Sequence, residues 1–185
     1  MYRQRGASSK SGGVAAWKLN GCIVLVCMLL VASAAGEQSE GSGQTGFYLI
    51  TAESETAASL PQPSGSQQVM LYTGKYLEGS ASEQPLYLLL PSKPDVPLEL
   101  SKAPTLIPEG GNGFPELQLA LTTSSARKLE ALTRHHMGQR VAFVIDGEPV
   151  SIRKIRGVIT DGQFRLSRCT DSACQYIYSR LKPEP

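Results

Sequence analysis

Hydrophobic and polar positions follow a regular order across residues 117–168, and this stretch predicts the centre of the domain. Leucines occupy every second position from Leu117 to Leu121, with polar or small residues between them, as in a half-buried strand. The run VAFVI at 141–145 is short, wholly apolar and rich in branched and aromatic side chains, which favours a strand inside a sheet. The pattern therefore predicts a strand on each side of residues 123–138.

A helix is predicted between these two strands. A threonine or serine at 122–124 can cap its N-terminus, and Gly138 supplies the left-handed residue that ends it. Charged side chains fall on one side of this helix, opposite a stripe of apolar and small ones. The predicted inner stripe consists of Ala126, Leu129, Leu132, Thr133, His136 and Met137.

Two Asp-Gly pairs predict tight turns between strands. Asp146-Gly147 follows VAFVI directly, and Asp161-Gly162 lies between GVIT and QFRL, so each pair predicts a hairpin. Residues 117–168 therefore read as strand, helix, strand, turn, strand, turn and strand.

Upstream of this stretch the predicted elements are shorter. Residues 98–106 are predicted to hold a helical turn, and the Gly- and Pro-rich run at 107–115 predicts a loop. Three apolar runs predict strands at 47–52, 69–72 and 85–90.

The N-terminal region is predicted to direct export. Residues 1–36 contain four Lys or Arg residues and no acidic residue, and an apolar run spans 22–35. This run is shorter than the roughly 20 residues that a membrane span needs, and it ends at Ala32 and Ala34 in the small-x-small pattern of a signal peptidase site. The sequence predicts a cleaved signal peptide and a periplasmic chain. The alternative is an uncleaved inner-membrane anchor at 21–36, with the domain still in the periplasm.

Formal charge is unevenly distributed along the chain. Residues 1–36 carry +4, residues 37–126 carry three Lys against ten acidic residues (−7), and residues 127–185 carry eleven Lys or Arg against six (+5), giving +2 in total. The basic residues of the last region are scattered among predicted strands without an aromatic stacking pattern. Nucleic-acid binding is therefore not predicted.

Cys169 and Cys174 are close in sequence, and in an oxidising compartment such a pair is expected to form a structural disulfide. The alternative is half of a metal site, which would need two further ligands. His135 and His136 do not supply them, because neighbours on a helix point about 100 degrees apart. No metal or cofactor is predicted.

No catalytic motif stands out in the sequence. It lacks the nucleophile elbow, the phosphate loop and the zinc-binding helix motif. Asp146 and Asp161 could be imagined as paired carboxylates, but each stands first in an Asp-Gly turn, where aspartate suits the turn geometry. The protein is therefore not predicted to be an enzyme.

The same stretch resembles the head subdomain of the first periplasmic loop of SecD, the membrane subunit that assists export through the Sec channel. The resemblance is most specific at 117–159, where GQRVAFVIDGEPVS follows the family pattern of G-(K/R)-R, an apolar strand, D-G-x, an apolar residue and S. Residues 85–106 resemble the family more loosely. The sequence departs from the family at Ser151, which is followed by Ile-Arg-Lys rather than by an early proline. The family also continues into membrane-spanning helices, whereas none follow here, so a stand-alone module without the export motor is expected.

This resemblance implies an α+β fold with one main helix packed on an antiparallel or mixed sheet, in a β-α-β-β-β core. The expected organisation is a signal peptide or anchor at 1–36, a flexible linker at 37–46 and a SecD head-like domain at 47–182. The most specific core of that domain is 117–168.

The resemblance further implies a non-catalytic binding module that holds unfolded secretory polypeptide or docks on a membrane translocation or envelope complex. The alternative is a structural or host-contact envelope protein that reuses the fold. Pro149 fits an edge strand, where an extended polypeptide could add by strand pairing. Positive charge beside this hairpin gives four candidate contacts, with an ordinary solvated surface as the alternative: Arg140, Arg153, Lys154 and Arg156.

Overall fold

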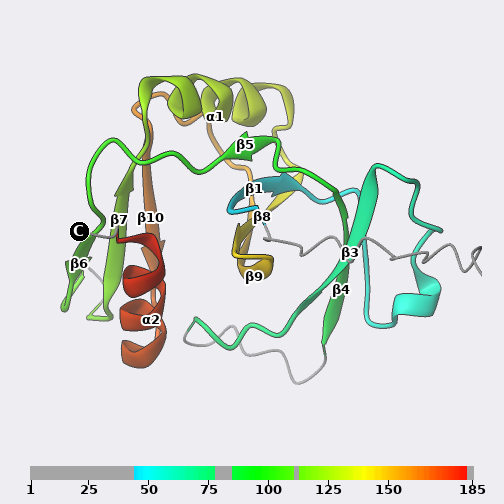
Figure 1. Ribbon diagram of the computed structural model, residues 1–185, viewed down its shortest axis with the longest axis horizontal. Helices are drawn as coiled ribbons and strands as arrows, with labels where there is room; N and C mark the ends of the chain where they lie inside the picture. Colours follow the sequence, from blue (N-terminus) through cyan, green and yellow to red (C-terminus); the bar gives the residue numbers. More distant parts are fainter. Residues whose placement is uncertain (1–43, 78–84, 111–112, 183–185) are drawn as a thin grey trace, which may run out of the picture. The chain divides into compact units, whose positions relative to one another are not determined.

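A computed structural model describes residues 44–77, 85–110 and 113–182 of the chain. The predicted signal peptide or anchor, its cleavage residues Ala32 and Ala34, and most of the predicted linker lie outside the described residues. Within the described ranges the chain forms three antiparallel sheets and two α-helices (Figure 1). The predicted α+β class is therefore confirmed. Neither of these helices has the length and apolar character needed to span a bilayer.

The central sheet has four strands in the order β5-β1-β8-β9. Its strands are β1 (Gly46–Leu49), β5 (Val96–Pro97), β8 (Arg140–Ile145) and β9 (Glu148–Lys154). β8 is apolar on both faces because both faces are covered. Asp146 and Gly147 join β8 to β9 with positive φ angles of 49° and 81°, as a two-residue hairpin turn requires, so this predicted hairpin is confirmed.

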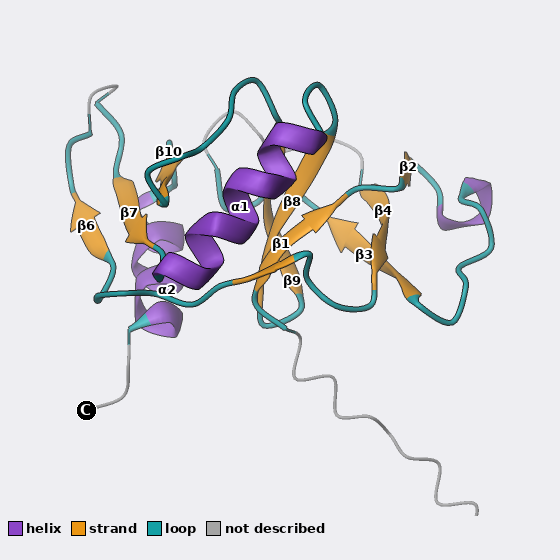
Figure 2. Cartoon of the chain, turned by 90° about the horizontal axis from the view of Figure 1, so that it is seen from above, coloured by secondary structure: helices purple, strands orange, loops and turns teal. Residues whose placement is uncertain are grey.

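Helix α1 (Thr123–His135) covers one face of the central sheet (Figure 2). The hydroxyl of Thr122 caps it by accepting a hydrogen bond from the backbone N–H of Ser125, at 3.3 Å. Leu129, Leu132 and Thr133 of the predicted inner stripe are buried. The prediction was wrong for Met137, whose side chain is 50% exposed, because the helix ends at His135 and Met137 lies in the following turn.

A second sheet, in the order β10-β7-β6, packs beside α2. Its elements are β6 (Thr105–Ile107), β7 (Glu116–Ala120), β10 (Gln163–Ser167) and α2 (Asp171–Leu181). The segment 98–104 before β6 has no helical turn, contrary to the prediction, and instead Leu100 forms an isolated bridge with Leu121.

The hairpin predicted at Asp161-Gly162 is also wrong. Residues 157–160 form no strand, and β10 pairs with β7 instead, with Leu166 opposite Leu117 and Phe164 opposite Leu119. This pairing places apolar side chains of both strands on one face, against the core.

The third sheet, in the order β2-β4-β3, packs on the other face of the central sheet. Its strands are β2 (Ala52–Ser54), β3 (Gln67–Tyr72) and β4 (Leu86–Pro91), and a short 3-10 helix, η1 (Ala57–Ser59), lies between β2 and β3. The backbone N–H of Ile50 bonds to Arg140 and that of Thr51 to Leu89, so the chain passes from one sheet to the other after β1.

Candidate functional site

A groove lies between the C-terminal half of α1, the end of β9 and the segment 155–159. Its volume is about 320 Å³. Its floor and walls are mainly apolar, and they are formed by Phe47, Leu129, Val141, Ile155, Ile159 and Phe164. Three basic residues stand at the groove as well: Arg153, Lys154 and Arg156. The site therefore combines apolar surface with positive charge.

The floor depends on an aromatic cluster that joins two sheets. The ring of Phe47 in β1 meets the ring of Phe164 in β10 edge-on, with 4.9 Å between centroids, and Phe143 in β8 lies 5.0 Å from both. Such contacts hold large side chains in fixed positions. The groove is consequently built on a preformed surface rather than on a loop alone.

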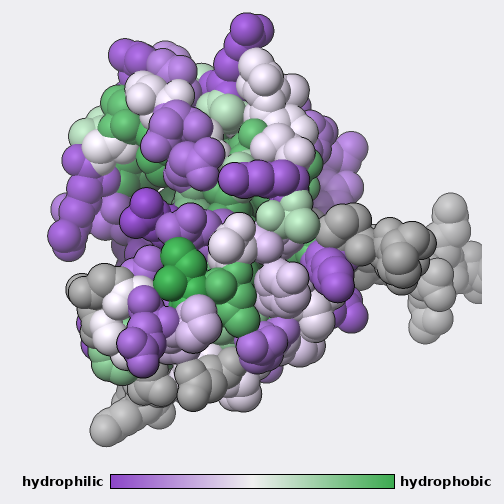
Figure 3. All heavy atoms as spheres, turned by 90° about the vertical axis from the view of Figure 1, so that its left-hand side faces the viewer, coloured by the Kyte–Doolittle hydropathy of each residue, from purple (hydrophilic) through white to green (hydrophobic). Residues whose placement is uncertain are grey.

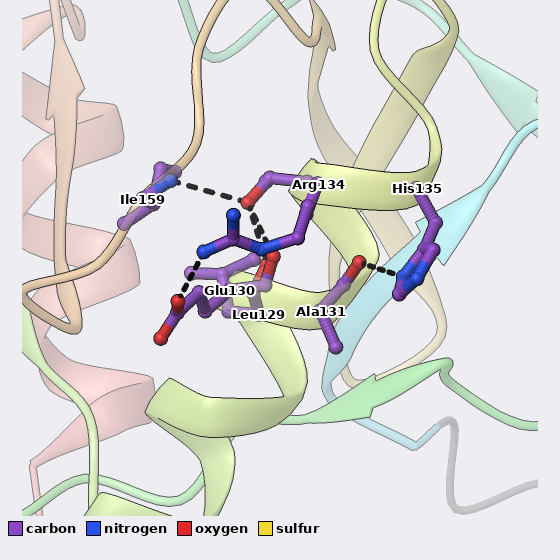
Figure 4. Close-up of polar contacts among 7 residues, drawn as sticks. Leu129, Glu130, Ala131, Arg134, His135 and Ile159 are labelled. Carbon is purple, nitrogen blue, oxygen red and sulfur yellow. Dashed lines mark hydrogen bonds and ion pairs between the residues drawn. The ribbon is translucent and has the colours of Figure 1, made fainter.

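The outer wall is a loop that is tied to α1 and to the turn after it. The backbone N–H of Gly138 donates to Ile155 at 2.9 Å, and that of Ile155 donates to Gln139 at 2.8 Å. Further along, the N–H of Ile159 donates to the hydroxyl of Thr133 at 3.1 Å (Figure 4). That hydroxyl donates in turn to the carbonyl of Leu129, at 2.8 Å. Both ends of the loop are therefore fixed.

Between these two ties the loop presents its side chains to solvent. Arg156 is exposed, and so is Val158, at 37% of its surface. Figure 4 shows that the neighbouring charges of α1 are satisfied on the helix itself, because Arg134 pairs with Glu130 at 2.6 Å. The positive charge at the groove comes from β9 and the loop.

Arg153 and Lys154 are exposed at the end of β9, beside Arg156. Within the described ranges, none of the three forms an ion pair. An acidic ligand would therefore not have to displace an existing salt bridge at these positions.

The structure brings together three of the five residues that the sequence suggested for binding. Arg140 lies at the start of β8 and forms an ion pair with Glu53 of β2, away from the groove lining. Pro149 lies in β9 opposite Val144 and is buried. β9 is the last strand in the hydrogen-bonded order of its sheet, but β3 lies close to it. The exposed part of β9 is the end that carries Arg153 and Lys154.

Sequence reasoning missed most of the groove floor. Phe47 and Phe164 stand far apart in the chain, and each was assigned only to a strand. Ile159 was assigned to a strand that does not form. The signal that could have found the wall is the sequence RKIRGVIT, in which a basic run is followed directly by apolar residues.

A second group of titratable side chains links β9 to the segment after β3. Lys75 pairs with Glu148 at 2.5 Å between Nζ and Oε1, and the hydroxyl of Tyr76 donates to the same carboxylate. Burial, and then the hydrogen bond to Glu148, raise the pKa of Tyr76 to about 12. Burial alone would raise the pKa of Glu148, but the hydrogen bonds from Lys75 and Tyr76 lower it. A tyrosine held protonated in this way is suited to structural linkage rather than to proton transfer.

The histidines and cysteines form no metal site in the part of the chain that the structure describes, where no group of three or more potential ligands gathers. His135 is exposed and bonds to Ala131, and His136 is half-buried. Cys169 and Cys174 are joined by a disulfide, and both are buried. The groove and its surroundings thus offer binding surface and charge.

Part of the chain matches a known protein family. Residues 99–174 match the family model described as SecDF, P1 head subdomain. This part of the chain is similar to the SecDF P1 head subdomain. It contains the wall of the groove and its three basic residues, whereas Phe47 lies before it.

The protein translocase subunit SecDF of Thermus thermophilus is 41% identical over 51 residues, which are 28% of this chain. The match spans only 7% of the length of that protein. Two solved structures of SecDF are similar to the chain. One is of a membrane component that enhances protein export, with a TM-score of 0.44, 18% identity and coverage of 76% of this chain and 64% of that one. The other is of SecDF in a super-membrane-facing form, with a TM-score of 0.45, 19% identity and coverage of 76% and 19%.

Proposed function

We propose that this chain is an exported, non-catalytic binding module that holds unfolded secretory polypeptide in the groove beside α1. The observation that carries this proposal is the combination of an apolar floor with three basic residues that have no ion-pair partner in the described ranges. Unfolded chains expose apolar side chains that folded proteins bury, and the groove offers a place for them. The SecDF P1 head match agrees with a role that needs no catalytic residue.

The polypeptide would lie in extended form at the end of β9. This strand is outermost in the hydrogen-bonded order of the central sheet, and Arg153 and Lys154 are its exposed residues. Strand addition there would bring alternate side chains of the ligand toward the groove. The buried residues Pro149 and Ser151 would not take part directly.

The proposed setting is the periplasm, reached by means of residues 1–36 as a signal peptide or anchor. The domain at 47–182 would then act beside a membrane translocation or envelope complex. Positive charge at the groove favours acidic segments of the polypeptide and would also speed their capture at low salt.

Charge reversal at the groove tests this function. The protein, purified in the form that cells export, would be titrated by NMR with a reduced and alkylated secretory polypeptide. We expect shifts in the amide signals of 153–159. We expect the double variant Arg153→Glu/Arg156→Glu to bind the polypeptide with an affinity reduced about fivefold or more, since each exposed charge pair contributes modestly.

The matched control is Arg165→Glu, an exposed arginine of β10 that does not line the groove. It should bind as the wild type does. Unperturbed 153–159 signals at saturating polypeptide would contradict the proposal and leave a structural or host-contact role.

A further inference from the structure

A second hollow, of about 520 Å³, lies between the segment before β6 and the end of α2. Figure 3 shows this side of the molecule, where hydrophobic side chains are visible between hydrophilic ones. Three leucines and three basic residues contribute to its lining: Leu98, Leu100, Leu181, Lys102, Arg180 and Lys182.

One wall of this hollow is fixed by an ion pair between α2 and the β8–β9 turn. Arg180 donates from Nε to the carboxylate of Asp146 at 2.6 Å, and its Nη2 contacts the same oxygen. The backbone N–H of Asp146 donates to the hydroxyl of Thr45, at 3.0 Å. The last turn of α2 is therefore attached to the central sheet, and the positions of its side chains are restricted before any ligand arrives.

The opposite wall is also attached to the sheets. The backbone N–H of Leu98 donates to the carbonyl of Thr45 at 3.1 Å, and that of Ser101 donates to the carbonyl of Ala120 at 2.8 Å. Residues 98–103, which form this wall, belong to no helix or named strand, yet these hydrogen bonds hold them beside β1 and β7. Both walls are thus preorganised, which reduces the entropy lost on binding.

Charge is unbalanced around the hollow. Asp146 partners Arg180, whereas Lys102 and Lys182 form no ion pair in the described ranges. Lys102 and Lys182 are both exposed, so their ammonium groups are accessible to a ligand in the hollow. The lining leucines are half-buried and leave apolar surface between the cations.

We propose that this hollow binds an acidic polypeptide segment, with a carboxylate held by Lys102 and Lys182 and a neighbouring apolar side chain against the leucines. The cations select an anion, and the apolar surface between them selects a ligand that is amphipathic rather than a free inorganic ion. The hollow is open to solvent, which suits a side chain of a peptide better than an acyl chain that must be enclosed. This site is separate from the groove beside α1 and does not depend on the function proposed for it.

A short capped peptide with two adjacent glutamates flanked by leucines tests the proposal, with its glutamine counterpart as the uncharged probe. NMR titration of the exported protein with the acidic peptide should shift the amide signals of 98–103 and 180–182. The double variant Lys102→Glu/Lys182→Glu should weaken binding about fivefold or more, and added salt should weaken binding to the wild type. Arg165→Glu, the same control as above, should leave the affinity unchanged.

Equal binding of the glutamine peptide would overturn the proposal, as would shifts confined to 153–159. Vesicles containing phosphatidylglycerol provide a further arm. If they shift the 98–103 and 180–182 signals and the acidic peptide does not, the hollow recognises a membrane surface and the proposal is wrong. The Arg153→Glu/Arg156→Glu variant separates the two sites. It should bind unfolded polypeptide more weakly at the groove but still bind the acidic peptide at this hollow.

Discussion

Glu148 shows how single side chains attach the family-matched part of the chain, residues 99–174, to the segment after β3. Its carboxylate forms an ion pair with Lys75 and accepts a hydrogen bond from the hydroxyl of Tyr76, both in the segment after β3. Tyr76 also stacks on Tyr176 of α2, at 5.9 Å between ring centroids. The carboxylate stands at the start of β9, the strand whose other end carries the groove charges. These four residues connect β9, the segment after β3 and α2, which are distant from one another in sequence.

The shifted pKa values of Glu148 and Tyr76 make the free energy of unfolding depend on pH. The pKa of Glu148 lies below its ordinary value of 4.5, so its contribution is complete above pH 4.5 and is lost as pH falls through the lowered pKa. The pKa of Tyr76 is raised from 10.0 to about 12, so its contribution is complete below pH 10 and is lost as pH rises toward 12.

Urea unfolding as a function of pH checks this interpretation. We expect Glu148→Gln to be less stable than the wild type at pH 7 and to lose less stability between pH 5 and 3, while the exposed control Glu55→Gln keeps the wild-type profile. If Glu148→Gln and the wild type showed parallel acid profiles, the carboxylate would not be the group responsible.

At the level of helices and strands, local sequence patterns predicted individual elements but did not predict which distant strands pair. The alternation of leucines, the Thr122 cap and the Asp146-Gly147 turn are local signals, and each predicted a strand, helix or hairpin that the structure contains. The pairing of β10 with β7 depends on a match between strands some forty residues apart. No local pattern contains that information, so GVIT was mistaken for its partner.

Helix α2 was missed although its signals are present in the sequence. Thr170 caps it by accepting from the N–H of Ala173, and Ala173, Cys174 and Ile177 form a buried stripe at helical spacing. The spacing of Cys169 and Cys174 predicts a disulfide, but it does not by itself indicate the helix that begins between the two cysteines. The groove was only partly predictable for a different reason, because its floor joins β1, α1 and β10.

The loop wall of the groove provides a test at this scale. Replacing Thr133 with valine keeps the shape of the side chain but removes the acceptor for the N–H of Ile159 and the donor to Leu129. Because Thr133 is buried, we expect a loss of about 1–3 kcal/mol in the free energy of unfolding and faster hydrogen exchange at Ile159.

Thr105→Val, at an exposed position in β6, serves as the control and should change neither quantity greatly. Unchanged exchange at Ile159 in Thr133→Val would show that the loop is held by other contacts. A wild-type affinity for unfolded polypeptide in a variant with a loosened loop would separate the wall from the binding function.

At the scale of the whole molecule, the central sheet is shared by two hydrophobic clusters, one on each face. One face packs against α1 and the β10-β7-β6 sheet, and the other packs against the β2-β4-β3 sheet. The family match begins at residue 99, so it includes β8 and β9 but excludes β1 and the β2-β4-β3 sheet. The groove crosses this boundary, since Phe47 supplies part of its lining. The segment before residue 99 is therefore needed to complete the groove.

Site-specific photo-crosslinking during export in living cells tests directly whether the groove holds unfolded polypeptide. A photoreactive residue would replace Val158 at the groove or, as the control, Val69 on β3, which are similarly exposed at 37% and 40%. We expect crosslinks from position 158 to newly exported, unfolded polypeptides and few or none from position 69. Equal crosslinking from the two positions, or none from position 158, would contradict the claim that the groove holds unfolded polypeptide.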